Sequence, residues 1–131
     1  MHVRPACQNH APMRLRALRG AITVEENDAE QILEATEELV HAVMERNALS
    51  HDDMVSCIFT CTDDLNAEFP AVAARQLGMS DVPLLCAREI DVPGSLPKVI
   101  RMLLHCYSEH EPRHVYLRGA TVLRKDLEAA Q

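Results

Sequence analysis

Aromatic side chains are scarce in this sequence, which contains two Phe, two Tyr and no Trp among 131 residues. Proteins that stack nucleic-acid bases on aromatic rings need more of them, so that class of binding site is disfavoured. The formal net charge of −7 also disfavours long-range attraction to nucleic acid or anionic lipid. We therefore expect no nucleic-acid partner, and a core built from Leu, Val, Ile, Ala and Met.

Paired cysteines and long apolar runs are also missing. The five cysteines form no CxxC motif, and an odd number of them is typical of reduced thiols in a cytosolic protein. No apolar stretch approaches the roughly 20 residues of a membrane span. Residues 1–12 are polar and lack the apolar segment of a secretory signal. We expect a cytoplasmic protein without a membrane segment, with residues 1–12 as a flexible extension and residues 13–131 as a single domain.

Motifs for metal, nucleophilic and phosphate chemistry are absent from the sequence. There is no HExxH motif, no paired cysteine spacing, no GxSxG elbow and no GxxxxGK[ST] loop. We therefore expect no metal and no cofactor. Cys86 is the most interesting candidate nucleophile, although a lone cysteine in a strand is more often a small buried hydrophobe.

Lysine is rare, with 2 Lys against 11 Arg. This bias fits either a GC-rich genome or a set of bidentate anion clamps, a role in which lysine is a poor substitute. Several cations and polar groups fall in or at the ends of predicted elements, and functional sites usually form at such ends. These residues are Arg19, Arg75, Glu89, Arg101, Tyr116 and Arg124.

The hydrophobic pattern predicts alternating strands and helices. Strands are expected over residues 13–21, 54–62, 82–90, 114–117 and 121–123. Helices are expected from Asn27 or Asp28 to near Asn47, over 70–78, and from Ser95 through the apolar stripe that ends at Leu104. The order β-α-β-α-β-α-β-β predicts a sheet with helices packed on it. The other face of that sheet would be apolar, and a second copy of the chain would cover it.

Four sequence strings indicate that these scattered residues belong to one functional site. They are LRGAITVEEN at 18–27, TDDLNAEFPAVAAR at 62–75, VPLLCAREIDVPGSLPKVIR at 82–101 and RHVYLRGATVLRKDL at 113–127. In this order and spacing they closely resemble the small monofunctional chorismate mutases of the bacterial trimeric type. The resemblance implies an α+β fold, with a mixed sheet packed against two to three helices, assembling as a pseudo-barrel homotrimer with active sites between subunits. It also implies the [3,3]-sigmatropic (Claisen) rearrangement of chorismate to prephenate, on the route to phenylalanine and tyrosine, without a cofactor or a covalent intermediate.

The resemblance also assigns roles to individual residues. Arg101 matches the arginine placed against the ether oxygen of the substrate. Arg19 matches an arginine that binds a carboxylate, and Tyr116 matches a tyrosine that assists it. Glu89 and Cys86 match the pair that meets the ring hydroxyl. The residues that match positions lining or closing the cleft, partly from the adjacent subunit, are Phe69, Arg75, Leu123 and Arg124.

Two other hypotheses stay open at this point. A small-metabolite binding module could use the same arginine-lined clefts without catalysis, because a fold alone does not fix a function. A purely structural oligomer would leave these side chains scattered in solvent. The chorismate mutase hypothesis requires Arg19, Glu89, Arg101 and Tyr116 to converge in one pocket.

Overall fold

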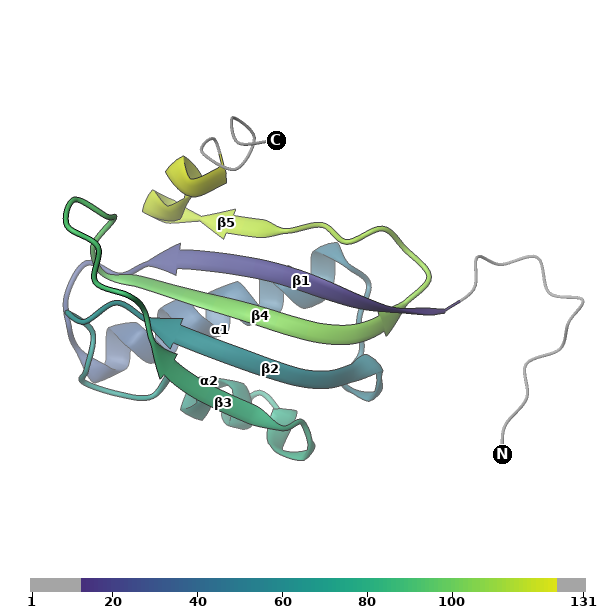
Figure 1. The fold of residues 1–131 in the computed structure, drawn as a ribbon. Helices are drawn as coiled ribbons and strands as arrows, with labels where there is room; N and C mark the ends of the chain where they lie inside the picture. Colours follow the sequence, from purple (N-terminus) through teal and green to yellow (C-terminus); the bar gives the residue numbers. More distant parts are fainter. Residues whose placement is uncertain (1–12, 125–131) are drawn as a thin grey trace, which may run out of the picture.

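The computed structural model describes residues 13–124, which fold into a mixed sheet with two α-helices packed on one face (Figure 1). The strands are β1 (Arg14–Thr23), β2 (Met54–Cys61), β3 (Leu84–Arg88), β4 (Val99–Ser108) and β5 (Val115–Leu117). The α-helices are α1 (Ala29–Arg46) and α2 (Pro70–Gln76). Short 3-10 turns occur at η1 (His51–Asp53), η2 (Met79–Asp81) and η3 (Arg118–Ala120). The expected extension over residues 1–12 lies outside the described residues. No helix in the described part is long and apolar enough to cross a membrane.

The five strands lie side by side in the order β3-β2-β4-β1-β5. Strand β4 is antiparallel to both of its neighbours, β1 and β2, whereas the two outer strands run parallel to the strands they join. The expected mixed sheet and α+β class are therefore confirmed. Because β4 is the central strand, a side chain on β4 can meet side chains from both halves of the sheet.

Helix α1 forms where the sequence predicted it. Its N-cap is Asp28, whose side chain accepts a hydrogen bond from the Gln31 backbone at 3.1 Å, and the Gln31 side chain accepts one from the Glu26 backbone. Residues that recur at helical spacing face the sheet and are fully or almost fully buried. The buried residues of α1 are Ile32, Ala35, Thr36, Leu39, Val40 and Val43.

The predicted third helix, from Ser95 to Leu104, is wrong because residues 99–108 form strand β4. Pro97 and the positive φ of 53° at Lys98 prevent a helix from continuing into this segment. Strand β4 carries apolar side chains on both faces. Apolar residues from the two faces together give a spacing that resembles the apolar stripe of a helix. Burial shows the true period of two, with full or nearly full burial at Ile100, Met102, Leu104 and Cys106.

The predicted strand over residues 121–123 is also wrong. Strand β5 ends at Leu117, and the chain then turns through η3 into a helical segment at residues 121–124. Arg118 adopts a positive φ of 54°, and its Nη2 contacts Oε1 of Glu38 at 3.0 Å. The Gly119 backbone donates a hydrogen bond to Oγ1 of Thr23 at 2.9 Å. These contacts tie the turn to the end of β1 and to α1, so strand pairing cannot continue.

The two faces of the sheet differ in what covers them. Helices α1 and α2 lie behind the sheet in Figure 1. The front face carries no α-helix among the described residues, and it is covered only near one end, where Ala120 of η3 and Leu123 pack against Ala21 and Val99. Alternation along the strands directs Arg19, Arg101 and Leu103 to this open face. Leu15, Leu85 and Tyr107 are exposed large side chains on strands of the same sheet.

Candidate active site

A pocket of about 280 Å³ lies on the open face of the sheet, over β1, β2, β4 and β5. Its lining includes Arg19 of β1, Arg101 of β4, Tyr116 of β5, and Glu89, the residue after β3. Four side chains that are far apart in the sequence thus meet in one pocket. This is the convergence that the chorismate mutase hypothesis required.

Strand register explains why these side chains meet. Ala21 is paired with Arg101 of β4 on one side and with Tyr116 of β5 on the other. Directly paired residues of neighbouring strands point to the same face, and so do residues two apart on one strand, such as Arg19 and Ala21. The small side chain of Ala21 therefore separates the three polar residues and leaves space between them.

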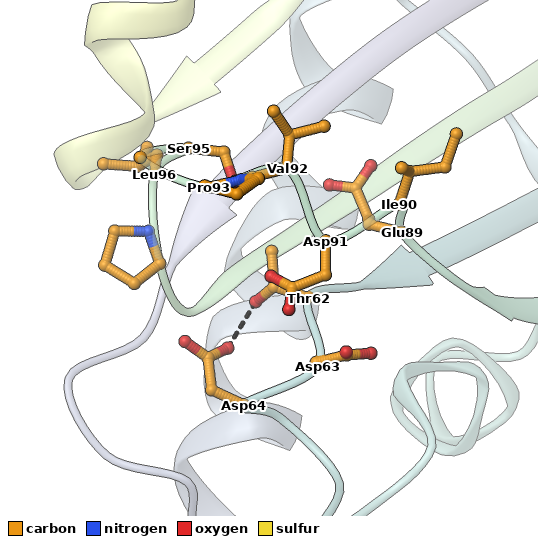
Figure 2. A pocket seen from close by; sticks show the side chains of 12 residues that line it. Thr62, Asp63, Asp64, Glu89, Ile90, Asp91, Val92, Pro93, Ser95 and Leu96 are labelled. Carbon is orange, nitrogen blue, oxygen red and sulfur yellow. Dashed lines mark hydrogen bonds between the residues drawn. The ribbon is translucent and has the colours of Figure 1, made fainter.

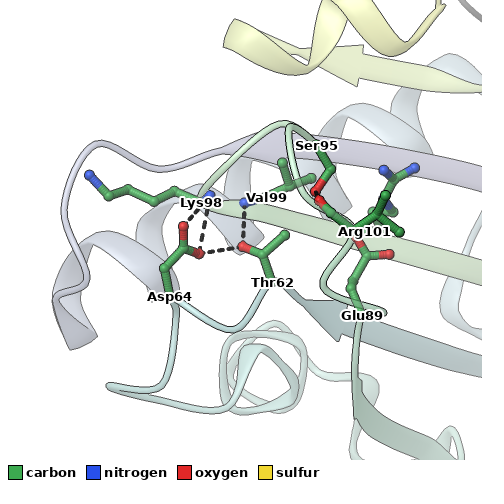
Figure 3. Close-up of polar contacts among 8 residues, drawn as sticks. Thr62, Asp64, Glu89, Ser95, Lys98, Val99 and Arg101 are labelled. Atoms are coloured by element: carbon green, nitrogen blue, oxygen red, sulfur yellow. Dashed lines mark hydrogen bonds and ion pairs between the residues drawn. The ribbon is translucent and has the colours of Figure 1, made fainter.

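Glu89 and Arg101 form an ion pair inside the pocket. Oε2 of Glu89 accepts a hydrogen bond from Nε of Arg101 at 2.8 Å (Figure 3), and the two side chains are 19% and 42% exposed, respectively. The Glu89 backbone donates to the Cys61 carbonyl at 2.9 Å, which fixes the glutamate to the end of β2. The remaining four N–H donors of Arg101 belong to its two terminal Nη groups. The pair therefore orients a positive fork by its inner nitrogen.

Helix α1 supports the sheet directly below the pocket, where Gly20 allows a close approach. A Cβ atom at Gly20 would lie 3.0 Å from Cγ of Met102 and 3.1 Å from Cδ1 of Leu39, which is tighter than most real contacts. Gly20 is the neighbour of Arg19 and Ala21 in β1. The absence of a side chain thus lets the helix press against the strand that carries one of the pocket arginines.

Thr60 is a pocket residue that sequence reasoning missed. It pairs with Arg101 in the register between β2 and β4 and lines the same pocket. Its Oγ1 is buried and has no hydrogen-bond partner among the described residues, although buried hydroxyls nearly always have one. Only the pairing of two distant strands brings Thr60 to the pocket, so no local sequence signal marked it.

A second hollow holds two further predicted residues, Cys86 and Phe69. It has a volume of about 300 Å³ and is also lined by Cys61 and Arg88. Cys86 is paired with the buried Phe59, so it points to the helix-covered face, opposite to the face of the Arg101 pocket. Within one chain, the structure does not bring Cys86 or Phe69 to the pocket that contains Arg101.

None of the three remaining predicted residues lines the pocket that contains Arg101. Arg75 is exposed on α2 and lines neither of these two pockets. Leu123 packs against the small cluster of Ala21, Val99 and Ala120, which Tyr116 also contacts. Arg124 is exposed at the end of the described residues.

Two cysteines in or near the second hollow, Cys57 and Cys61, have raised pKa values. Burial raises the pKa of Cys57 to about 12, and the nearby Cys86 adds to that shift. Burial likewise raises the pKa of Cys61 to about 12, with smaller contributions from Cys86, Glu89 and Asp64. Because the thiolate is the reactive form of cysteine, Cys57 and Cys61 are poor nucleophiles at neutral pH.

An acidic hollow of about 380 Å³, whose lining side chains are drawn in Figure 2, shares Glu89 with the arginine pocket. Its lining includes Asp63, Asp64 and Asp91. Asp64 accepts hydrogen bonds from the Lys98 backbone at 3.0 and 3.1 Å, as Figure 3 shows. Glu89 thus lies on the boundary between a negative and a positive surface, so an anionic ligand is favoured on the arginine side. Residues 13–124 contain no group of three or more His, Cys, Asp or Glu that could hold a metal ion.

Together, the fold and the pocket define a class of protein: a small α+β domain whose open sheet face presents arginines to an anionic ligand. The chain belongs to the chorismate mutase type I family, whose sequence model it matches over residues 15–127. The family that the four sequence strings indicated is therefore confirmed, and with it an isomerase activity.

Chorismate mutases of known sequence or structure align with this chain over nearly the whole of their own length. The chain is 53% identical to chorismate mutase AroH of Thermus thermophilus over 122 residues, which cover 89% of this chain and 99% of the relative. It is 41% identical to chorismate mutase AroH of Bacillus subtilis over 119 residues, covering 88% and 94% of the two chains. The solved chorismate mutase from Clostridium thermocellum has a TM-score of 0.80 and 47% identity, covering 82% of this chain and 98% of that one.

Proposed function

We propose that this chain converts chorismate to prephenate, on the route to phenylalanine and tyrosine, by a concerted [3,3]-sigmatropic rearrangement in the Arg101 pocket. The observation that carries the proposal is the convergence of Arg19, Glu89, Arg101 and Tyr116 in one pocket of a chorismate mutase family member. A unimolecular, concerted rearrangement needs no general base, nucleophile or redox group. It needs a pocket that holds a reactive conformer and stabilises developing charge.

Arg101 is the residue that stabilises the negative charge that develops in the transition state. The ether oxygen of the substrate gains negative character as its bond to carbon lengthens. A guanidinium stays protonated and offers planar, multiple donors, so its terminal Nη groups can meet both this oxygen and a carboxylate. The Glu89 contact at Nε fixes the fork before the substrate arrives, and a preorganised donor costs no reorganisation in the transition state.

Arg19 and Tyr116 bind a substrate carboxylate in this proposal. Both line the pocket from strands on the side of β4 opposite to Glu89. They are well placed to hold the side chain of the substrate over its ring in the compact conformer that reacts. Arg75 and Arg124 are proposed to supply further positive charge, with Phe69 and Leu123 as apolar walls.

Glu89 has two roles in the proposal. Its Oε2 orients Arg101, and its second oxygen accepts a hydrogen bond from the ring hydroxyl of the substrate. Its negative charge also suits the partial positive character that develops on the ring fragment. A passive binding module for a doubly anionic ligand gains nothing from a carboxylate in its pocket, so Glu89 favours catalysis over simple binding.

The energetic demand requires more than one contribution. A rate gain of about 10⁶-fold corresponds to about 8 kcal/mol of barrier reduction. One well-aimed donor contributes about 3–4 kcal/mol. Arg101 alone is therefore insufficient, and restriction of the substrate to its reactive conformer supplies much of the rest.

We also propose that the chain works as a pseudo-barrel homotrimer in the cytoplasm. The uncovered sheet face exposes Leu15, Leu85 and Tyr107, and a face of this kind is stabilised when another copy covers it. In such an assembly a neighbouring subunit completes the cleft with Phe69, Cys86 and Arg75, which one chain keeps apart from Arg101. Sedimentation at the mass of three 14.7 kDa chains would support this, whereas a monomer that remains fully active would contradict it.

A direct assay tests the activity. Purified protein is added to chorismate, the loss of its ultraviolet absorption band is followed, and the product is identified chromatographically as prephenate. The Arg101→Ala variant serves as a negative control, and Arg46→Ala, an exposed arginine at the end of α1, serves as a matched control. A wild-type protein that leaves chorismate unchanged, or that yields another product, would overturn the proposal.

A further inference from the structure

The connection between β4 and β5 is fastened to the end of α1. Asn47, the C-cap of α1, is buried with 5% of its surface exposed. Its Oδ1 accepts a hydrogen bond from the Arg113 backbone at 2.8 Å, and its Nδ2 donates to the Arg113 carbonyl at 2.9 Å. A further bond from Nδ2 reaches the Val43 carbonyl inside the helix. The backbone at Arg113 is thereby held on both of its polar groups, which places the next residue, His114.

His114 in turn connects this anchored segment to β1. Its Nδ1 accepts a hydrogen bond from the backbone N–H of Arg19 at 3.0 Å. The regular pairing of β1 with β5 begins only at Gly20 and Val115, so the imidazole extends the ladder by one position. The backbone of a proposed substrate-binding arginine is thus held by a side chain.

The protonation state of His114 suits this contact. Partial burial lowers the pKa of His114, and the positive charge of Arg19 lowers it further. The ring is therefore neutral at neutral pH, and the contact with Arg19 requires an unprotonated Nδ1, which places the ring proton on Nε2. The same histidine precedes β5, the strand that carries Tyr116. One imidazole accordingly links the backbone of Arg19 to the strand that carries Tyr116.

We propose that His114 is a positioning residue of the active site, which holds the Arg19 backbone so that the guanidinium faces the pocket beside Tyr116. His114 itself touches no substrate. The proposal rests on the proposed role of Arg19 in binding a substrate carboxylate. A histidine with only a structural role would affect stability without changing substrate binding through Arg19. The KM for chorismate therefore distinguishes the two roles.

Two variants distinguish the role of the acceptor atom from that of the aromatic ring. His114→Phe keeps an aromatic ring but removes the acceptor, and His114→Asn keeps an acceptor oxygen near the Nδ1 position without the ring. We expect His114→Phe to raise KM about fivefold with kcat changed by less than about twofold, the scale of one net hydrogen bond. His114→Asn should keep KM within about twofold of the wild type. His110→Phe, on the same connection and exposed, is the matched control and should behave as the wild type.

Equal increases in KM for His114→Phe and His114→Asn would overturn the proposal, since the acceptor would then be irrelevant. Circular dichroism and sedimentation confirm that each variant is folded and assembled. If His114→Phe does not fold, His114→Leu replaces it in the same comparison.

A double variant tests whether His114 acts through Arg19. In an Arg19→Ala background, His114→Phe should not raise KM further, because the side chain that it positions is gone. A second fivefold increase in that background would overturn the proposal. If Arg19→Ala alone leaves KM unchanged, the proposed carboxylate role of Arg19 fails and this inference fails with it. If Arg19→Ala raises KM but His114→Phe does not, the inference alone fails.

Discussion

Oε2 of Glu89 lies 2.8 Å from Nε of Arg101, so a carboxylate from the end of β3 holds an arginine of the central strand by its inner nitrogen. The contact spans β2, which lies between the two strands in the sheet. It leaves the two terminal nitrogens of the guanidinium to define the fork. The position of that fork therefore depends on an acidic residue that directly follows another strand.

The first prediction concerns this pair. Glu89→Ala should lower kcat by about 10–100-fold, because it releases Arg101 and removes an acceptor for the substrate hydroxyl. Glu89→Gln keeps an amide oxygen that can still accept from Nε, so it should lose less activity than Glu89→Ala. Steady-state kinetics at saturating chorismate measures both. Wild-type kcat in Glu89→Ala would contradict the role given to this contact.

The same pair predicts non-additive kinetics. If Glu89 acts partly by orienting Arg101, then Glu89→Ala should cost less in an Arg101→Ala background than in the wild type. Fully additive losses in barrier height would show that the two residues act independently.

Arg19 is predicted to serve binding more than chemistry. Arg19→Ala should raise KM by about tenfold or more, because a charge-assisted contact to a carboxylate is lost, while kcat falls by a smaller factor. A chorismate titration followed by initial rates separates the two constants. Arg14→Ala, which removes an exposed arginine from the start of the same strand, is the control. An unchanged KM would argue against the carboxylate role.

Most of the fold could be predicted from the sequence because most helices and strands have a recognisable pattern within their own segment. The apolar stripe of α1 follows helical spacing behind its Asp28 cap, and the segment of β2 is rich in apolar and β-favouring residues. Strand β4 is an exception. Its apolar side chains fall on both faces of the sheet and do not show a single period. Pairing with β1 and β2, which are distant in the sequence, decides between strand and helix.

The site was predictable to a different extent. Arg19, Glu89, Arg101 and Tyr116 were first noted for their places in or at the ends of predicted elements. Matching of whole sequence strings then assigned them to one candidate site, and the sheet brings them together. Local patterns alone could not have done this, because they assigned Arg101 to a helix. Thr60 and His114 were missed for the same physical reason, since each owes its place to a partner on another strand: Arg101 for Thr60 and Arg19 for His114.

Cys86 is predicted to be dispensable for the chemistry. Cys86→Ser should retain at least about a tenth of wild-type kcat, because the proposed rearrangement forms no covalent bond to the enzyme and serine keeps a hydroxyl donor. Cys57 and Cys61, with pKa values of about 12, remain protonated at pH 8 and should not replace it as nucleophiles. Complete loss of turnover in a folded Cys86→Ser variant would revive covalent catalysis.

Gly20 is predicted to matter for stability. Gly20→Ala places a methyl group about 3 Å from Met102 and Leu39, so these side chains must shift by a few tenths of an ångström between α1 and β1. Overpacking of this kind costs about 1–3 kcal/mol. Thermal unfolding followed by circular dichroism should show a lower midpoint than the wild type. Ala17→Gly, at a position of β1 on the open face, controls for changes in backbone freedom. An unchanged midpoint for Gly20→Ala would contradict the close approach.

The central claim is tested most directly by the turnover number of Arg101→Ala, measured at saturating chorismate on protein whose assembly state matches the wild type. The account predicts a kcat at least about 10²-fold below that of the wild type, the scale of one lost transition-state donor. Arg101→Lys should also be strongly impaired, since a flexible ammonium cannot reproduce a planar fork held at Nε. A kcat close to that of the wild type in Arg101→Ala would contradict the account.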